Sequence, residues 1–401
     1  MSVVYITYWS LRDPLCLSQS LPVLRALSRS GRQLTLITFE QTQWALPPKD
    51  QASMHQLLAS EGIRWEPLRY HKRPRVLSTL FDIALGVWRC LGLARKGRVR
   101  LFHGRGTVPA AIAFIASRLT GARFLNDADG PLSEEYVDAG ILRRESLVHR
   151  VTRSAEARLL RAADGVAVLT EQRRVQVKGI ARSKVTVLPC AVDTQHFVPC
   201  VDASARTKLG LEGIVFVYAG KAGGWYLIDE MLDFAAVAGE VVGKITLLIL
   251  TTQDPHVFSR AATARGLACV VRGADREEMP RYLAAGDVGL SFVLPSPSKT
   301  ACSPVKNGEY LACGLPIITT AGIGDYSNLV ARTRVGVVVK SLDRAGYRKA
   351  AEELGSLLTD PSLRSRCRAV AASEVGLSEI VVPRYVGLYE DLLGPPVKGT
   401  V

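Results

Sequence analysis

The chain has 401 residues, of which 48% are hydrophobic and 22% charged, as expected of a soluble globular protein with two domains of roughly 200 residues. The net charge of +14 predicts an anionic partner such as nucleic acid, nucleotide phosphates or a membrane face. The eight cysteines form no CxxC or Cys/His pair, which argues against zinc and a disulfide framework. We expect no membrane-spanning helix, and we expect the segment MSVVYITYWS to be a buried strand and not a signal peptide.

Strands and helices alternate through the first half of the sequence, as β-branched runs and amphipathic patterns indicate. In chain order we expect strands at 3–9, 33–39, 99–106, 122–127, 164–170 and 184–190, and helices at 20–31, 77–94, 108–121 and 143–163. The helix at 77–94 lies in a block, 64–105, in which eleven Lys and Arg are opposed only by Glu66 and Asp82. An apolar helix with basic flanks is either an ordinary domain helix or a helix lying on a membrane surface.

The same alternation restarts in the second half of the sequence. We expect strands at 214–220, 244–250, 268–273, 288–294, 316–320 and 335–339, with helices between them. This order predicts an α/β protein with two doubly wound, Rossmann-like domains, whose parallel sheets are covered on both faces. We place the N-terminal domain at 1–195, joined by a C-terminal helix at 379–395, and the second domain at 205–378.

Ligands of such sheets bind beyond the carboxyl ends of the strands, where four loops carry polar residues. These loops are FHGRG (102–106), NDADGPLSEEYVDAG (126–140), AGKAGGWY (219–226) and SFVLPSPSKTACSPVKNGE (291–309). The two glycine-rich loops match neither the dinucleotide fingerprint nor the Walker pattern. A diphosphate held by backbone N–H groups, Lys221 and Lys306 is the alternative.

Each candidate residue also has a structural interpretation. Glu309 would lie in the first turn of a helix opened by 307–309, either as a ribose ligand or only as a carboxylate favoured by the helix dipole. His103 could be a structural histidine, and Lys221 a solvated lysine. Asp127 and Asp129 are close in sequence but lack further partners at metal-ligand spacing, so a loop turn explains them better than a metal site.

Several segments together resemble the family-4 retaining glycosyltransferases with the two-Rossmann (GT-B) fold. VTVLPCAVDTQHFVP (185–199) is similar to their interdomain segment, and SPVKNGEYLACGLPII (303–318) to their donor-site segment, which AGDVGLSFV (285–293) precedes. FLNDADGPLSEEYVDAG (124–140) resembles the FDxRGxxPEE-type loop of a bacterial surface-polysaccharide subgroup.

The resemblance implies a nucleotide-sugar donor, UDP-linked, on the second domain and a glycan or lipid-linked acceptor on the first, with transfer in the cleft. It implies hexosyl transfer in the synthesis of a cell-surface polysaccharide such as lipopolysaccharide or capsule, by a cytoplasmic enzyme without a cofactor. We expect no metal, and no nucleic-acid partner because no recognition-helix, RRM or zinc pattern appears. The basic N-terminal domain indicates peripheral contact with the anionic inner face of the membrane. A nucleotide-sugar epimerase or hydrolase on the same fold is the alternative function.

Site residues are carried over by position. Glu309 matches the ribose ligand, Lys221 the cation at the diphosphate, and Gly273 a main-chain contact to the base. His103 or Arg105 falls where the family has a cleft histidine near the sugar. The catalytic candidates are therefore His103, Arg105, Lys221 and Asp127. Gly220, Ser303, Lys306 and Gly308 are added to the donor-binding ones.

The sequence also departs from the family pattern. The first of the family's paired glutamates is Ala301 here, and aromatic and apolar residues replace a second basic residue after Lys221. Cys190-Ala191 stands in place of Asn-Gly, and Asp129 in place of a loop arginine. The family's first glutamate faces the donor sugar, so a catalytically degenerate glycosyltransferase is a further alternative.

Overall fold

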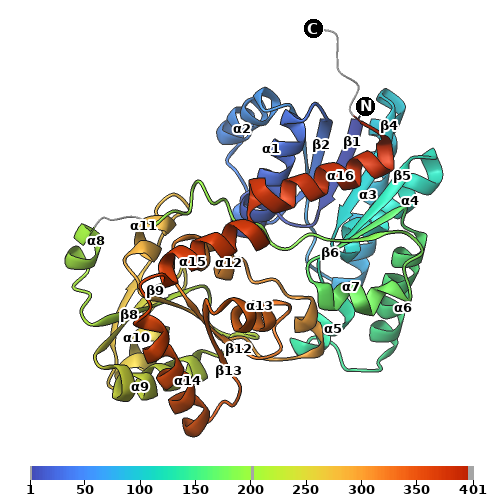
Figure 1. Cartoon of the computed structure of the whole chain (residues 1–401). Helices are drawn as coiled ribbons and strands as arrows, with labels where there is room; N and C mark the ends of the chain where they lie inside the picture. The colour runs from blue at the N-terminus through green and yellow to red at the C-terminus, as the bar shows by residue number, and fades with distance from the viewer. Residues whose placement is uncertain (1, 200–202, 396–401) are drawn as a thin grey trace. The chain divides into compact units, whose positions relative to one another are not determined.

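The protein, described here from a computed structural model, folds into two compact units, each built on one parallel sheet (Figure 1). The structure describes residues 2–199 and 203–395. The N-terminal unit comprises Met1–Pro189 together with Val381–Val401, and the C-terminal unit comprises Cys190–Ile380. The expectation of two doubly wound α/β sheets is confirmed.

The N-terminal sheet has seven parallel strands in the order β3-β2-β1-β4-β5-β6-β7. Its strands are β1 (Ser2–Thr7), β2 (Gln33–Glu40), β3 (Ile63–Arg69), β4 (Val99–Arg105), β5 (Arg123–Ala128), β6 (Gly165–Val168) and β7 (Val185–Val187). Runs such as SVVYIT in β1 are almost wholly buried, as parallel strands are when helices cover both faces.

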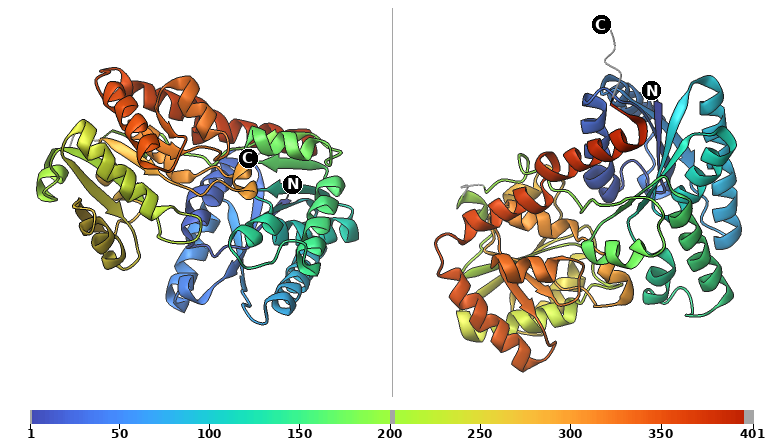
Figure 2. Two further views of the ribbon diagram at one scale, coloured as in Figure 1. Left: turned by 90° about the horizontal axis from the view of Figure 1, so that it is seen from below. Right: turned by 45° about the vertical axis from the view of Figure 1, so that its right-hand side comes forward.

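Helices cover both faces of this sheet, and three of them, α3, α4 and α6, lie side by side on one face (Figure 2). The last helix of the chain, α16, packs beside α1. The helices of the unit are α1 (Leu21–Arg29), α2 (Pro48–Ser60), α3 (Arg75–Lys96), α4 (Thr107–Thr120), α5 (Leu132–Asp138), α6 (Leu147–Ala162), α7 (Glu171–Lys178) and α16 (Val382–Leu393).

The C-terminal sheet repeats this winding with six parallel strands in the order β10-β9-β8-β11-β12-β13. The strands are β8 (Ile214–Ala219), β9 (Ile245–Leu250), β10 (Ala268–Arg272), β11 (Val288–Ser291), β12 (Ile317–Thr320) and β13 (Gly336–Val339). The helices are α8 (Ala203–Lys208), α9 (Ile228–Val242), α10 (Pro255–Thr263), α11 (Met279–Ala284), α12 (Val305–Ala312), α13 (Tyr326–Thr333), α14 (Arg344–Leu358) and α15 (Leu363–Val370).

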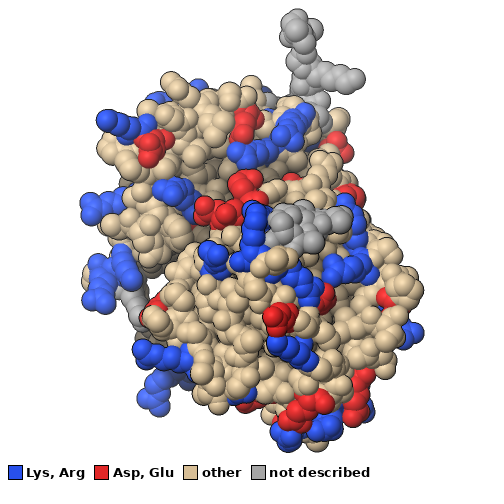
Figure 3. Space-filling model, turned by 90° about the vertical axis from the view of Figure 1, so that its left-hand side faces the viewer, with Lys and Arg blue, Asp and Glu red and all other residues tan. Residues whose placement is uncertain are grey.

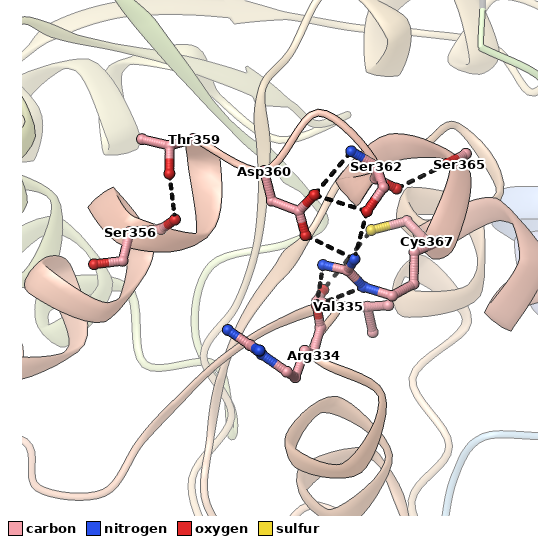
Figure 4. A network of polar contacts seen from close by, with 9 residues as sticks. Arg334, Val335, Ser356, Thr359, Asp360, Ser362, Ser365 and Cys367 are labelled. Atoms are coloured by element: carbon pink, nitrogen blue, oxygen red, sulfur yellow. Dashed lines mark hydrogen bonds and ion pairs between the residues drawn. The ribbon is translucent and has the colours of Figure 1, made fainter.

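A polar network fixes the turn between α14 and α15 (Figure 4). The Asp360 carboxylate accepts hydrogen bonds from the backbone N–H of Ser362 at 2.9 Å and from Arg366 at 2.8 Å. Arg366 also donates to the carbonyl of Arg334, just before β13.

Lys and Arg are interspersed with Asp and Glu over the face shown in Figure 3.

Strand β3 and helices α2, α5 and α7 are elements of the first half that the sequence pattern did not predict. Strand β3 contains Pro67 and charged residues, which argue against a central strand. It lies at the edge of the sheet, where a strand tolerates proline because one side needs no ladder hydrogen bonds.

Helix α3 is long and apolar enough from Val76 to Lys96 to cross a membrane by length and composition, although a third of it is buried in the protein.

Gly289 on β11 allows α12 to pack directly on the sheet. A Cβ at this position would lie 2.3 Å from Cδ2 of Tyr310, a buried residue of α12. The Tyr310 hydroxyl accepts a hydrogen bond from the N–H of Ala219, the last residue of β8, at 2.8 Å. This close approach therefore sets the position of α12 relative to the carboxyl end of β8.

We expect Gly289→Ala to lower the free energy of unfolding by about 1–3 kcal/mol, because overpacking would displace the Tyr310 ring. The control is Gly239→Ala in α9, where only Ile245 lies within 4 Å of the added Cβ. That change should raise stability by about 0.5–1 kcal/mol, since alanine favours a helix interior over glycine. Urea unfolding of both variants would measure the difference, and equal stabilities would contradict the packing argument.

Candidate functional site

The strand order of the C-terminal sheet reverses between β8 and β11, where such sheets bind ligands. Gly220 and Lys221 follow β8 directly. Lys221 is exposed, and its carbonyl accepts a hydrogen bond from the Tyr218 hydroxyl at 2.7 Å. Gly220 has a φ of +152°, which favours glycine, and a Cβ there would lie 2.9 Å from the Lys306 ammonium, which would have to move.

Lys306 is a buried cation on α12 beside the end of β8. Only 9% of its surface is exposed, and its Nζ has no hydrogen-bond partner among the described residues. The ammonium lies over the rings of Tyr218 and Tyr226, 4.2 and 4.4 Å from their centroids. Burial lowers the pKa of Lys306 to about 7. The group is thus held by aromatic faces and has three free donors for an anion.

Glu309, one turn further along α12, has a side chain that is 12% exposed. Arg276 NH1 lies 3.6 Å from its Oε1, and the Arg276 guanidinium stacks over Phe197. Burial raises the pKa of the Glu309 carboxyl. The expected position at the start of the helix is wrong: α12 begins at Val305, after Pro304, so Glu309 lies in the second turn. Proline favours the boundary just before the helix.

Three other residues of the 291–309 loop and α12 have defined surroundings. The Ser303 hydroxyl accepts a hydrogen bond from the N–H of Cys190 at 3.1 Å. Gly308 packs close to Val192, where a Cβ would be 3.3 Å from the valine Cβ. Both residues therefore hold the segment that opens the C-terminal unit, in addition to any contact with a donor. Ala301 is buried, with 1% of its surface exposed.

Two buried polar residues of this region, Asn307 and Lys299, were not predicted from the sequence as site residues. Asn307 is fully buried, and neither its amide nitrogen nor its oxygen has a hydrogen-bond partner among the described residues. Lys299 is also buried, with its ammonium 3.7 Å from the Trp225 ring centroid. The aromatic residues after Lys221 could have indicated Lys299, because they supply ring faces where a second basic residue was expected. Gly273, after β10, is exposed, with open space around it apart from the carbonyl of Thr251.

In the N-terminal unit, three of the predicted catalytic residues form one buried network at the ends of β4 and β5. Arg105 NH1 donates to Asp127 Oδ2 at 2.8 Å, and His103 Nε2 lies 3.4 Å from the same oxygen. Two tyrosines of α16 complete the network. The Tyr385 hydroxyl donates to Asp127 at 2.8 Å, and the Tyr389 hydroxyl lies 2.7 Å from His103 Nδ1.

Burial determines the protonation of this network. Burial alone would raise the pKa of Asp127, but Arg105 and His103 bring it well below its usual range, so the carboxylate is charged. Burial lowers the pKa of His103, which favours neutral imidazole. Both ring nitrogens of His103 are already engaged, so in this arrangement the network joins α16 to the sheet. The catalytic assignment of these three residues stays a prediction.

The pKa of Asp129, beyond the end of β5, is shifted in the opposite direction to the pKa of Asp127. Burial raises its pKa to about 7, Arg105 opposes the shift and Asp127 adds to it. Gly106 faces it, since a Cβ there would lie 3.5 Å from the Asp129 Oδ1. A carboxyl group that changes protonation near neutral pH therefore lies beside the carboxyl end of β4. Within the described residues, no three His, Cys, Asp or Glu side chains are grouped to hold a metal ion.

Two family models match the chain, one on each unit. A glycosyl transferase 4-like domain matches residues 19–191, and a glycosyl transferases group 1 domain matches residues 214–360. The chain belongs to the family-4-like glycosyltransferases of the GT-B fold. The family resemblance of the interdomain and donor-site segments is thereby confirmed.

Among similar proteins is a D-inositol 3-phosphate glycosyltransferase from Stackebrandtia nassauensis, 22% identical over 84% of this chain and 76% of that protein. Two solved structures have the same fold. Anabaena HepE in complex with UDP-glucose superposes with a TM-score of 0.68 at 15% identity, over 97% of this chain and all of that one. WaaG, a glycosyltransferase involved in lipopolysaccharide biosynthesis, has a TM-score of 0.62 at 14% identity, over 98% and 100% of the two chains.

The buried network of this glycosyltransferase predicts a large effect of removing one charge. Asp127→Asn would leave the Arg105 guanidinium buried without its counter-ion, and should lower the free energy of unfolding by about 3–5 kcal/mol. Tyr385→Phe removes one neutral donor and should cost about 1–3 kcal/mol. Tryptophan fluorescence during urea unfolding would report these changes, because Trp9, Trp44, Trp65 and Trp88 lie in the N-terminal unit.

The control for the network is the exposed ion pair between Lys184 and Asp391, which joins β7 and α16 regions at 2.9 Å. Asp391→Asn should change stability by less than about 1 kcal/mol, as exposed pairs do. If Asp127→Asn were as mild as Asp391→Asn, the network would not hold α16.

Proposed function

We propose that this glycosyltransferase moves a hexosyl group from a UDP-sugar to a glycan or lipid-linked acceptor in the synthesis of a cell-surface polysaccharide, with retention at the anomeric carbon. The observation that carries the proposal is the unpaired ammonium of Lys306 at the turning point of the C-terminal sheet. HepE binds UDP-glucose and WaaG acts in lipopolysaccharide biosynthesis, which supports the donor and the acceptor class.

The donor's diphosphate would bind at the end of β8, between the exposed Lys221 and the buried Lys306. An ammonium without a hydrogen-bond partner in a low-dielectric site is a strong ligand for an anion. Gly220 leaves the space through which a phosphate oxygen can approach, since a side chain there would meet Lys306. The ribose hydroxyls would donate to the Glu309 carboxylate, whose charged form Arg276 favours from 3.6 Å against the effect of burial on its pKa.

The same groups would drive the chemistry. Cleavage of the sugar–phosphate bond leaves negative charge on the UDP diphosphate, and Lys306 and Lys221 would stabilise that charge as it develops. The departing phosphate oxygen would take the proton of the attacking acceptor hydroxyl on the same face of the sugar, which gives retention. We propose that two lysines supply this stabilisation without a metal. Transfer measured with EDTA present would test whether the reaction proceeds without a metal. The enzyme would act in the cytoplasm.

Replacement of Glu309 by glutamine should weaken UDP binding about 10- to 100-fold, because a charge-assisted hydrogen bond to ribose contributes about 1.5–3 kcal/mol. Isothermal titration calorimetry with UDP measures the change. Glu353→Gln, on the exposed face of α14, is the control and should bind UDP as the wild type does. Unchanged affinity in Glu309→Gln would refute the ribose assignment.

Lys306 should make UDP binding depend on pH. With a pKa of about 7 in the free protein, its amine is mostly neutral at pH 8.5, and binding of the diphosphate would raise this pKa. Each UDP would therefore take up nearly one proton at pH 8.5, and affinity would fall by up to about tenfold per pH unit above pH 7. Calorimetry in buffers of different ionisation enthalpy counts the protons taken up.

Lys306→Met separates function from folding. It should abolish the proton uptake and weaken UDP binding, while stability stays the same or rises, because a buried unpaired charge is replaced by an apolar side chain of similar length. Proton uptake that persists in Lys306→Met would show that another group responds to the diphosphate.

A further inference from the structure

Helix α3 carries apolar residues on its outer face as well as on the inner face, where Cys90 and Leu93 pack in the core. Five large apolar residues along it, each 55–67% exposed, face solvent: Val76, Leu77, Leu80, Phe81 and Trp88. Ala84 is exposed in the same stripe. Leu77, Phe81, Ala84 and Trp88 recur at the spacing of one helical face, and no charged residue interrupts them. Monomeric proteins rarely expose an apolar stripe of this length without a partner for it.

The opposite face of α3 is fixed to the N-terminal unit, so the helix cannot turn its apolar side inward. Asp82 is fully buried, and it binds the Tyr8 hydroxyl at 2.7 Å and His71 Nδ1 at 2.6 Å. Gly86 lies against Ile112 of α4, where a Cβ would come within 2.6 Å of the isoleucine Cδ1. These contacts hold α3 along the surface of the unit and leave its apolar stripe outside.

The charges around the stripe have one sign. Exposed basic residues lie at both ends of α3: Lys72 and Arg73 before it, and Arg95, Lys96 and Arg98 at its end. The two carboxylates of the surrounding block do not offset them. Asp82 is buried, and Glu66 is paired with Arg64 at 2.7 Å and with Arg89. The surface therefore combines an apolar stripe with positively charged ends, which neither carboxylate of the block offsets.

We propose that this α3 face binds the surface of an anionic lipid bilayer, with its apolar stripe in the interfacial region and its basic ends at the lipid phosphates. A helix with an apolar face and basic flanks lies in the membrane plane and gains both apolar burial and attraction to anionic lipids. Charge complementarity favours this occupant over a second copy of the chain, because two such faces would bring like charges together. The proposal does not rest on the proposed sugar transfer.

The test is co-sedimentation of the full chain with vesicles of phosphatidylglycerol and phosphatidylcholine, or of phosphatidylcholine alone, without any acceptor. The wild type should bind the anionic vesicles, and binding should weaken as salt rises, since screening shortens the range of the charges. Leu77→Glu/Phe81→Glu/Trp88→Glu should reduce binding about tenfold or more. The control Val175→Glu/Val257→Glu/Leu342→Glu adds the same charge at exposed apolar residues elsewhere and should bind much more tightly than the α3 variant.

Two further measurements separate the contributions. Trp88→Phe should sediment with the vesicles, but the blue shift of tryptophan fluorescence on binding should be reduced relative to the wild type. Arg95→Ser/Lys96→Ser/Arg98→Ser should lower binding to anionic vesicles roughly fivefold per charge removed.

Three outcomes would overturn the proposal. The wild type could fail to bind anionic vesicles, or the α3 variant could bind them as well as its control does. Light scattering could instead show a wild-type dimer that the α3 variant dissociates, without vesicle binding by either, in which case a second copy covers the face.

Discussion

The parallel direction of every strand in both sheets is the constraint on which the candidate site depends. Parallel strands bring all their carboxyl ends to one edge, and the reversal of order beside β8 opens that edge to a ligand. The end of β8, the loop before α12 and α12 itself meet there. Tyr310 joins them directly, since its ring packs on Gly289 of β11 and its hydroxyl binds Ala219 of β8. The position of Lys306 follows from this arrangement.

The polar clusters around Asp127 in the N-terminal unit and around Lys306 in the C-terminal unit differ in how the cost of burying their charges is offset. In the N-terminal unit, Oδ2 of the Asp127 carboxylate has Arg105, His103 and Tyr385 around it, so its charge is compensated inside the protein although Oδ1 has no partner among the described residues. In the C-terminal unit, the Lys306 ammonium has only ring faces around it. A buried charge beside an opposite charge is compensated within the fold, whereas one without a counter-ion or hydrogen-bond partner costs stability unless a ligand completes it. This difference favours Lys306 over His103 as a residue that meets a substrate.

Much of the fold could be predicted from the sequence, because buried parallel strands are continuous apolar runs that stand out from the helices between them. Strand β3 could not, because an edge strand has only one neighbour and tolerates Pro67 and charged residues. For the site, Glu309 and Lys221 were identified by motif, and Lys306 by its closeness to Glu309 in sequence. Lys299 had only an indirect signal, the aromatic residues after Lys221. Asn307 could not be found this way, because its burial without a hydrogen-bond partner depends on which groups the fold brings near it.

Helix α16 belongs to the N-terminal unit although it follows the whole C-terminal unit in the chain, and this order has a consequence during synthesis on the ribosome. At about 5–20 residues per second, translation of the intervening segment takes on the order of tens of seconds. During that time the nascent N-terminal unit has His103, Arg105 and Asp127 in place but lacks Tyr385 and Tyr389. The network around Asp127 can thus be completed only after translation has passed the second unit, and until then the surface that α16 covers on the N-terminal unit stays exposed.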